Sequence, residues 1–190
     1  MEIQPATTGS WPALEALVGA GGDPRWCWCQ YWRKPGANWT NTTPAENRAN
    51  LEALVGADPA PGLVAMRDGV AVGWVGLGPR EAFPRLARSR TLPQLAGEDV
   101  WVINCFVVAR KERGRGIGDA LLAAAVAYAR DHGARLVEGF PVDTGGERMP
   151  SAGAYTGTRG MFDRAGFAEA GPTTSRAPGG RPRVVMRRTP

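Results

Sequence analysis

The sharpest contrast between apolar and polar positions along the chain lies between residues 100 and 133. Val100 to Val108 is an apolar run rich in β-branched and aromatic residues, with charged residues on either side. This pattern predicts a largely buried strand. From Ile117 the apolar residues recur at helical spacing, and Gly133 follows where a C-terminal cap is expected. The segment therefore predicts a strand, a charged loop and a helix.

Shorter patterns predict the remaining elements. The expected strands cover residues 2–5, 62–66, 70–78, 135–142, 167–169 and 183–188. The expected helices cover residues 10–18, 43–55 and 155–164, the second of which begins at the capping box Thr43-Pro-Ala-Glu46. Residues 79–97 form a long loop or a short helix, which is either functional or a solvated surface.

The length and composition fit one domain. The chain has 190 residues, of which 43% are hydrophobic, so we expect a single domain over residues 1–190 with a proper core. No apolar run reaches membrane-spanning length and the start does not read as a signal peptide, so we expect a soluble cytoplasmic protein with no membrane partner. Cys27, Cys29 and Cys105 would then be reduced thiols, and His132 as the sole histidine leaves no convincing metal site.

The net charge of +5 comes almost wholly from arginine, because Lys34 and Lys111 are the only lysines. Part of the excess lies at residues 110–115, where an anionic ligand would use it, and part at residues 181–188. No basic stripe accompanies a groove-reading element, so a nucleic-acid partner is not expected. The charge favours acidic substrates or no particular class.

The charged loop before the expected helix has the composition of an anion-binding site. Glycines stand at every second position here, Gly114, Gly116 and Gly118, between the arginines and the start of the expected helix. Their amides have no side chains in front of them, and a helix N-terminus adds partial positive charge, which suits a phosphate or pyrophosphate. A charged turn precedes the first glycine and no Gly-Lys-Ser/Thr follows, so the loop is neither a dinucleotide fingerprint nor a P-loop. A plain turn without a ligand rarely needs three spaced glycines.

Tryptophan is concentrated near the start of the chain. Five of the seven tryptophans lie within the first 39 residues, and the segment Trp26-Cys-Trp-Cys-Gln-Tyr-Trp32 holds three of them. Such a cluster is either a core plug or the wall of a pocket. Trp28 and Trp32 are therefore candidate substrate-binding residues, with burial in the core as the alternative.

The glycine-rich loop also matches a known motif. Arg113, Gly116 and Gly118 fit the pattern Arg/Gln-x-x-Gly-x-Gly/Ala, and the chain here resembles motif A of the GNAT superfamily of acetyl-CoA-dependent N-acetyltransferases. Met161 to Phe167 resembles the superfamily's later helix-to-strand passage. The resemblance implies an α/β fold with a mixed, twisted sheet of about seven strands, helices on both faces and central strands that splay at the cofactor site. It also implies transfer of an acetyl group from acetyl-CoA to an amine of a small molecule or peptide, by direct attack in a ternary complex.

The resemblance further implies roles for individual segments. Residues 100–167 would form the cofactor-binding core, and residues 5–60 would supply the acceptor side. The strand backbone would hold the acetyl oxygen and the pantetheine arm of coenzyme A, and the loop would hold the pyrophosphate. The cofactor-binding candidates are Phe106, Val107, Val108, Arg113, Gly114, Arg115, Gly116, Ile117 and Gly118. Superfamily domains often dimerise through late strands, so a homodimer is a further expectation.

The general acid departs from the usual pattern. Many members place a tyrosine in Asn-x-x-Ala-x-x-x-Tyr-x-x-x-Gly-Phe; here Phe162 stands at the tyrosine position and Tyr155 at the asparagine position. Tyr155, two turns away along the expected helix, is the candidate acid. Departure of the thiolate unassisted or through water is the alternative, with Tyr155 then a packing residue.

Two further residues are catalytic candidates. Glu138 is a carboxylate in an otherwise apolar strand and could be the base, as could Glu98 or Asp99, although a solvated or salt-bridged carboxylate is the alternative for each. Cys105 lies in the proposed cofactor strand and could accept an acyl group. With no histidine nearby to form a thiolate, it could equally be a small buried residue.

Two rival functions stay open. The missing tyrosine is compatible with a non-catalytic acyl-CoA-binding module. The tryptophan-rich segment is compatible with a protein-modifying acyltransferase that docks through it. Acetylation of a polycationic aminoglycoside is less expected, because the sequence shows no sign of the strongly acidic pocket that such a substrate needs.

Overall fold

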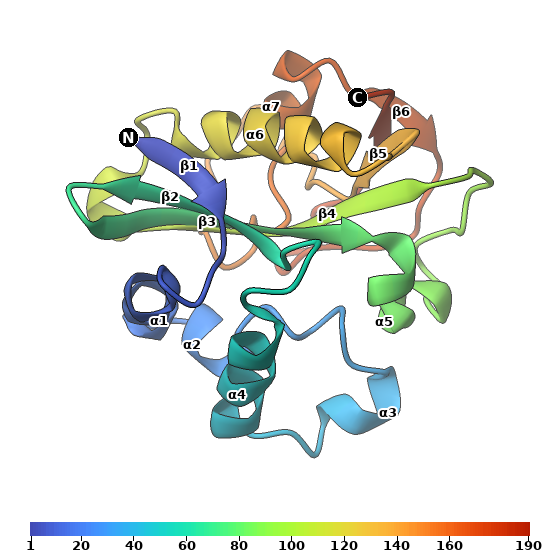
Figure 1. The fold of residues 1–190 in the computed structure, drawn as a ribbon. Coiled ribbons are helices and arrows are strands. Elements are labelled where there is room, and N and C mark those ends of the chain that lie inside the picture. Colours follow the sequence, from blue (N-terminus) through green and yellow to red (C-terminus); the bar gives the residue numbers. More distant parts are fainter.

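A computed structural model describes residues 1–190, apart from the side chains at positions 37 and 38. Its centre is a seven-stranded sheet of order β1-β2-β3-β4-β5-β7-β6 (Figure 1). The pairing of β4 with β5 is parallel and the other pairings are antiparallel, so the sheet is mixed. The strands are β1 (Glu2–Pro5), β2 (Gly62–Arg67), β3 (Val70–Pro79), β4 (Val100–Val108), β5 (Leu136–Gly139), β6 (Ala168–Gly171) and β7 (Val185–Arg188).

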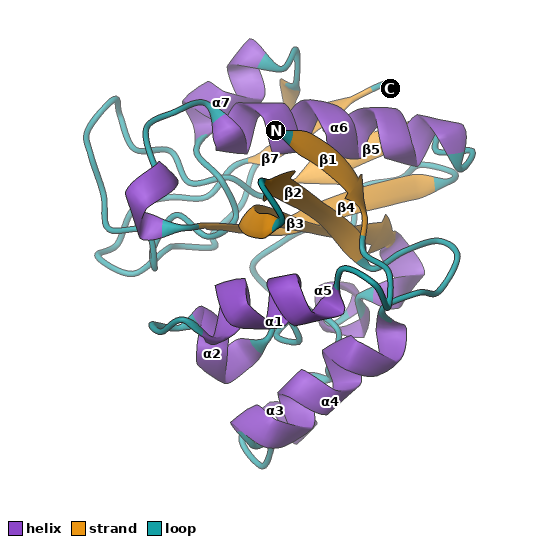
Figure 2. Ribbon diagram, turned by 60° about the vertical axis from the view of Figure 1, so that its left-hand side comes forward, coloured by secondary structure: helices purple, strands orange, loops and turns teal.

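Helices cover both faces of the sheet, which confirms the predicted α/β architecture (Figures 1 and 2). One face carries α6 (Ile117–Asp131) and α7 (Arg159–Arg164). The other carries α1 (Trp11–Gly19), α2 (Pro24–Cys27), α3 (Gly36–Trp39), α4 (Pro44–Leu54) and α5 (Pro84–Ala87). Two short 3-10 turns, η1 (Arg80–Ala82) and η2 (Arg110–Glu112), follow β3 and β4. None of the described helices is long and apolar enough to cross a membrane.

The apolar faces of these elements form three buried clusters. The largest lies between the sheet and α6, whose inward residues follow a helical period. A second packs α1 against the opposite face, around Trp74. The third lies under α5 and includes Trp32, Phe140 and Val185. The sheet is therefore buried on both faces, as its nearly continuous apolar strands predict.

The central strands β4 and β5 separate part-way along their length. Their pairing runs from Val100–Leu136 to Ile103–Gly139 and then stops, although β4 continues to Val108. At the same point the register with β3 shifts, because Ile103 pairs with Leu77 and Cys105 with Gly76. Asn104 is therefore an extra, bulged residue, and a bulge bends the strand that carries it.

Two contacts hold this separation open. The ring of Phe162 packs so closely on Gly139 that an added Cβ there would lie 2.3 Å from the ring. Further along, the segment 155–157 lies between β4 and the continuation of β5. The amide of Phe106 donates to the carbonyl of Tyr155 at 2.6 Å, and the amide of Val142 donates to the carbonyl of Gly157 at 3.0 Å.

Most of the predicted elements are confirmed, and two boundaries were wrong. The strands at residues 2–5 and 100–108 agree with the prediction, and Thr43 caps α4 through both hydrogen bonds of a capping box. The strand expected over residues 135–142 ends at Gly139, because the chain then turns away from β4. The helix expected from Tyr155 begins only at Arg159, because Gly157 has a φ of +86° and Thr158 is extended.

We predict that Gly139→Ala destabilises the fold, because its methyl group would meet the buried ring of Phe162. Overpacking of this kind costs about 1–3 kcal/mol. Gly160→Ala is the control, because an added Cβ there would meet only the end of Arg164 at 3.6 Å. Denaturant unfolding of both variants would measure the difference. Equal stability of the two would show that Phe162 does not constrain the exit of β5.

Candidate active site

The loop Arg113–Gly118, called the glycine loop below, joins the end of β4 to α6. Gly114 and Gly116 both have a φ of +76°, which residues with a side chain rarely adopt, and Gly116 is the N-cap of α6. No described side chain caps this N-terminus, so its first amides stay free for a ligand. Gly118 has another reason to be glycine, because an added Cβ would approach the sulfur of Met161 at 3.2 Å. The loop thus has the free amides and local positive charge that an anion needs.

The β5-facing edge of β4 leads away from this loop. Beyond Ile103 the backbone of β4 is not paired with β5, so Phe106, Val107 and Val108 lie on an open strand. Within this stretch the Phe106 amide already bonds to Tyr155, and the Val108 carbonyl accepts from Nε of Arg113 at 3.1 Å. An extended ligand arm that added to this edge would therefore replace the Tyr155 contact or continue beside it.

Tyr155 lies at the far end of that open edge. It belongs to the turn before α7 and not to the helix, so the prediction that it lies two turns along that helix was wrong. Its carbonyl bonds to β4, and its ring lies 5.1 Å from the guanidinium of Arg183. Burial raises the pKa of the Tyr155 phenol well above its usual value. The hydroxyl is protonated at neutral pH, as an ordinary phenol is, and burial makes it a weaker acid.

A cavity of about 450 Å³ opens beside Tyr155. Besides Tyr155, three segments build its wall: the chain after α2, the region around α5, and the connection between β6 and β7. We call it the arginine cavity, because its lining includes Arg85, Arg88, Arg176 and Arg183 together with Tyr31 and Trp32.

The two candidate tryptophans have different surroundings. Trp28 is buried in the cluster around Trp74 and lies 6.2 Å from the ring of Trp11. Trp32 is also buried but reaches the arginine cavity, and its indole nitrogen has no partner among the described residues. The core interpretation therefore suits Trp28, and the pocket-wall interpretation suits Trp32.

Glu138 lies in an ion pair on the sheet. Its carboxylate accepts from Arg187 at 2.6 Å and from Arg80 at 3.0 Å, and the side chain is 2% exposed. Both guanidinium groups donate hydrogen bonds to Oε2 of this carboxylate. Glu138 does not line the arginine cavity, so this geometry argues against a role as the base and favours the salt-bridged alternative. Glu98 and Asp99 are exposed and pair with Arg135.

Cys105 is buried beside another thiol. Its sulfur lies 3.2 Å from the sulfur of Cys29, and both residues are buried. The hydrogen bond to Cys29, together with burial, raises the pKa of Cys105 well above its usual value. A thiol kept protonated is a weak nucleophile, so the surroundings favour a packing role over an acyl acceptor. Within the described part of the chain, no three His, Cys, Asp or Glu side chains gather as metal ligands would.

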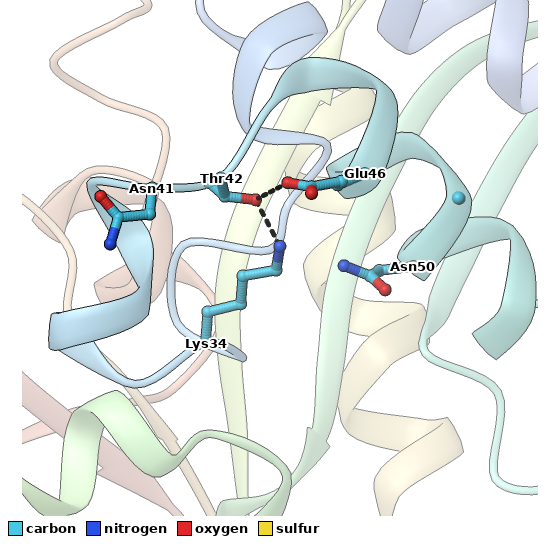
Figure 3. Close-up of a pocket in the computed structure, with 6 residues that line it drawn as sticks. Lys34, Asn41, Thr42, Glu46 and Asn50 are labelled. Carbon is cyan, nitrogen blue, oxygen red and sulfur yellow. Dashed lines mark hydrogen bonds between the residues drawn. The ribbon is translucent and has the colours of Figure 1, made fainter.

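A second hollow, of about 380 Å³, lies at the start of α4 (Figure 3). Three of its polar side chains bond to one another or to the start of the helix. Thr42 donates to Glu46 at 3.3 Å and accepts from Lys34, while Glu46 caps α4. The hollow is therefore part of the helix cap, and we assign it no ligand.

Sequence reasoning missed several residues of this site. Arg85 and Arg183 carried no pattern that separated them from the other arginines. Asn104, by contrast, had a signal, because it is a lone amide within the apolar run of β4. Its side chain is buried, and neither of its polar atoms has a partner among the described residues.

Comparison with known proteins identifies a family for this chain. The model of the acetyltransferase (GNAT) family matches residues 26–157. A comparison with curated proteins found no match.

Solved structures share the fold. A ribosomal-protein-alanine N-acetyltransferase from Brucella melitensis is 22% identical with a TM-score of 0.57, over 100% of both chains. A GCN5-related N-acetyltransferase from Kribbella flavida is 21% identical with a TM-score of 0.58, over 100% of this chain and 97% of that one. The GNAT domain of S. lividans PAT is 18% identical with a TM-score of 0.59, over 99% and 89%.

We predict that Trp28→Ala lowers the free energy of unfolding by roughly 3–5 kcal/mol, because it removes a buried aromatic ring. Trp26→Ala is the matched control, because Trp26 is 42% exposed and packs mainly on Trp39. Its cost should be about 1 kcal/mol. Denaturant unfolding of both variants would compare them, and a small loss for Trp28→Ala would contradict its placement in the core.

Proposed function

From the premise that this chain belongs to the acetyltransferase (GNAT) family, we propose that it moves an acetyl group from acetyl-CoA to an amine. The acceptor is a small molecule or a peptide, and it attacks the thioester directly in a ternary complex. The acetyltransferase class follows from the family, whereas the acceptor and the residue roles below are proposals.

One observation carries the proposal. The glycine loop lies at one end of the open edge of β4, and Tyr155 contacts the other end of that edge. Tyr155 also lines the arginine cavity. A long thioester with a pyrophosphate at one end and a reactive acyl group at the other needs an anion site, a strand edge and a reaction site in this order. The unpaired strand edge and the uncapped start of α6 are the features that fit it.

Acetyl-CoA supplies the activated acetyl thioester. In our proposal the amides of the glycine loop hold its pyrophosphate, with Arg113 and Arg115 nearby to balance the charge. The main chain of Phe106, Val107 and Val108 holds the arm and orients the carbonyl, which needs a hydrogen-bond donor as its oxygen gains negative charge. The amide of Phe106 would give up its bond to Tyr155 for this purpose.

Tyr155 is the proposed general acid. The amine forms a bond to the carbonyl carbon, the carbon–sulfur bond breaks, and the departing thiolate takes the phenolic proton. The phenol carries that proton at neutral pH, and solvent restores it afterwards. Phe162, at the position of the family tyrosine, is fully buried against Phe167 and has no proton to give.

The proton that the amine loses goes to water in this proposal. No aspartate or glutamate is among the described residues that line the arginine cavity. The acceptor therefore enters in its neutral form, and its rate of acetylation should rise with pH toward the pKa of the amine.

The two rivals make different demands on the structure. A module that only binds acyl-CoA would not need a protonated tyrosine between the open strand and a cavity. A protein-docking surface needs exposed aromatic area, but within the segment 26–32 Trp28 and Trp32 are buried and Trp26 alone is exposed among its tryptophans. Cytoplasmic location and homodimer formation stay predictions.

The direct test measures turnover of acetyl-CoA with a broad panel of amines, using the release of free coenzyme A thiol as the readout. Acceptor-dependent thiol release is expected. Tight coenzyme A binding without thiol release for any amine would support the non-catalytic module instead.

We predict that Gly116→Asp abolishes binding of coenzyme A, because it adds a negative charge and bulk where the pyrophosphate approaches. Gly133→Asp is the matched control: Gly133 has a φ of +83° and no close neighbours, so it suffers the same backbone strain at the other end of α6. Calorimetry should show binding to the control alone. Unchanged affinity in folded Gly116→Asp would remove the pyrophosphate from this loop.

We predict that Tyr155→Phe lowers turnover by roughly a hundredfold or more and leaves the affinity for acetyl-CoA nearly intact. Tyr128→Phe is the control, because the Tyr128 hydroxyl bonds to the amide of Ala60 at 2.8 Å, away from the cavity. Single-turnover kinetics would isolate the chemical step. A near-native rate for Tyr155→Phe would take the phenol out of the mechanism.

A further inference from the structure

We infer that the acceptor is a small amine that also carries a carboxylate or phosphoryl group, and that Arg85 and Arg183 bind this group in the arginine cavity. The inference rests on the acetyl transfer proposed above and names the substrate class of the same site.

The charge of the cavity is the first argument. Four arginines line it, and no described lining residue is acidic. None of the four makes an ion pair with the described carboxylates, whereas Arg80 and Arg187 elsewhere share Glu138. A hollow lined by one sign of charge attracts and concentrates ligands of the other sign.

Arg183 is the more deeply buried of the two proposed contacts. It is 4% exposed, and its Nη1 donates to the Thr156 hydroxyl and, at 3.4 Å, to the Phe140 carbonyl. Burial lowers its pKa, but an arginine keeps its charge at neutral pH. A buried cation without a carboxylate partner is costly, and an anionic ligand would offset that cost.

Arg85 supplies an independent observation. Its guanidinium stacks over Tyr31 at 4.1 Å, and its Nε donates to the Lys34 carbonyl at 3.4 Å. Its Nη2 is buried and has no partner among the described residues. Guanidinium groups bind carboxylate and phosphoryl oxygens in pairs, so an oxyanion would satisfy this unused donor.

The size and remaining walls of the cavity define the rest of the acceptor. About 450 Å³ lies within the range of small-molecule sites. Tyr31, Trp32 and Tyr155 add aromatic surface, which can cover the carbon skeleton between the oxyanion and the amine. The Arg183 guanidinium lies 5.1 Å from the Tyr155 ring, so an acceptor held at the arginines also lies beside the proposed acid.

Matched pairs of amines test the inference. The pairs are 4-aminobutanoate with its methyl ester, 2-aminoethylphosphonate with its diethyl ester, and phenylalanine with phenylalaninamide. We expect the anionic member of at least one pair to have a kcat/KM higher by about tenfold or more, because two guanidinium groups lose their partner with the neutral member. The carboxylate and phosphonate pairs separate the two kinds of oxyanion. Absence of a preference for the anionic member in all three pairs would overturn the inference.

Variants of Arg85 and Arg183 test whether these residues cause the preference for the anionic substrate. Arg85→Gln should bring the ratio of the two kcat/KM values toward one by lowering the value for the anionic member, and Arg183→Lys should weaken the ratio with less risk to folding. Arg130→Gln is the control, because Arg130 is exposed on α6 and pairs with Asp131. An equal loss for both members of a pair would show a structural role only and would contradict the assignment.

A binding measurement separates this inference from the proposed function. If no amine is acetylated, calorimetric titration of 2-aminoethylphosphonate, 4-aminobutanoate and their neutral esters into the protein saturated with coenzyme A still tests the cavity. Binding that prefers the anion and is lost in Arg85→Gln supports the inference while the transfer fails. Absence of any preference for the anion overturns it.

Discussion

The parting of β5 from β4 after the Ile103–Gly139 pair is the constraint on which the rest of the structure depends. A parallel ladder that continued would pair every amide of β4 and leave no strand edge for a ligand. Three local features prevent this: the bulge at Asn104, the ring of Phe162 on Gly139, and the segment 155–157 between the two strands. Each is a packing or hydrogen-bonding feature of the protein itself, so the opening is present before any ligand arrives.

This opening connects two regions of positive charge that differ in kind. The glycine loop offers backbone amides at a helix start, which suit a pyrophosphate of fixed geometry. The arginine cavity offers side chains from segments that are far apart in the sequence. Fold and cofactor chemistry are therefore tied to the strand, whereas acceptor choice is tied to the cavity wall.

The sequence predicted best what local patterns determine. The apolar run of β4, the helical period of α6 and the cap at Thr43 each fix their element within a residue or two. It predicted poorly what tertiary contacts determine. The end of β5 depends on Phe162, which is distant in sequence, and Tyr155 leaves the helix because of the left-handed Gly157. Arg85 and Arg183 meet only after the chain has folded, and the two arginines that neutralise Glu138 come from η1 and β7.

Amide hydrogen exchange with and without coenzyme A tests the central claim most directly, because it reports on each part of the open strand separately. The account predicts new protection at Val108 and the glycine loop and altered exchange over residues 155–157, as the Tyr155 carbonyl gives up the amide of Phe106. The amides around Lys34 and Glu46 should not change. Protection confined to that polar hollow, or binding of coenzyme A with no change along β4 and the glycine loop, would contradict it.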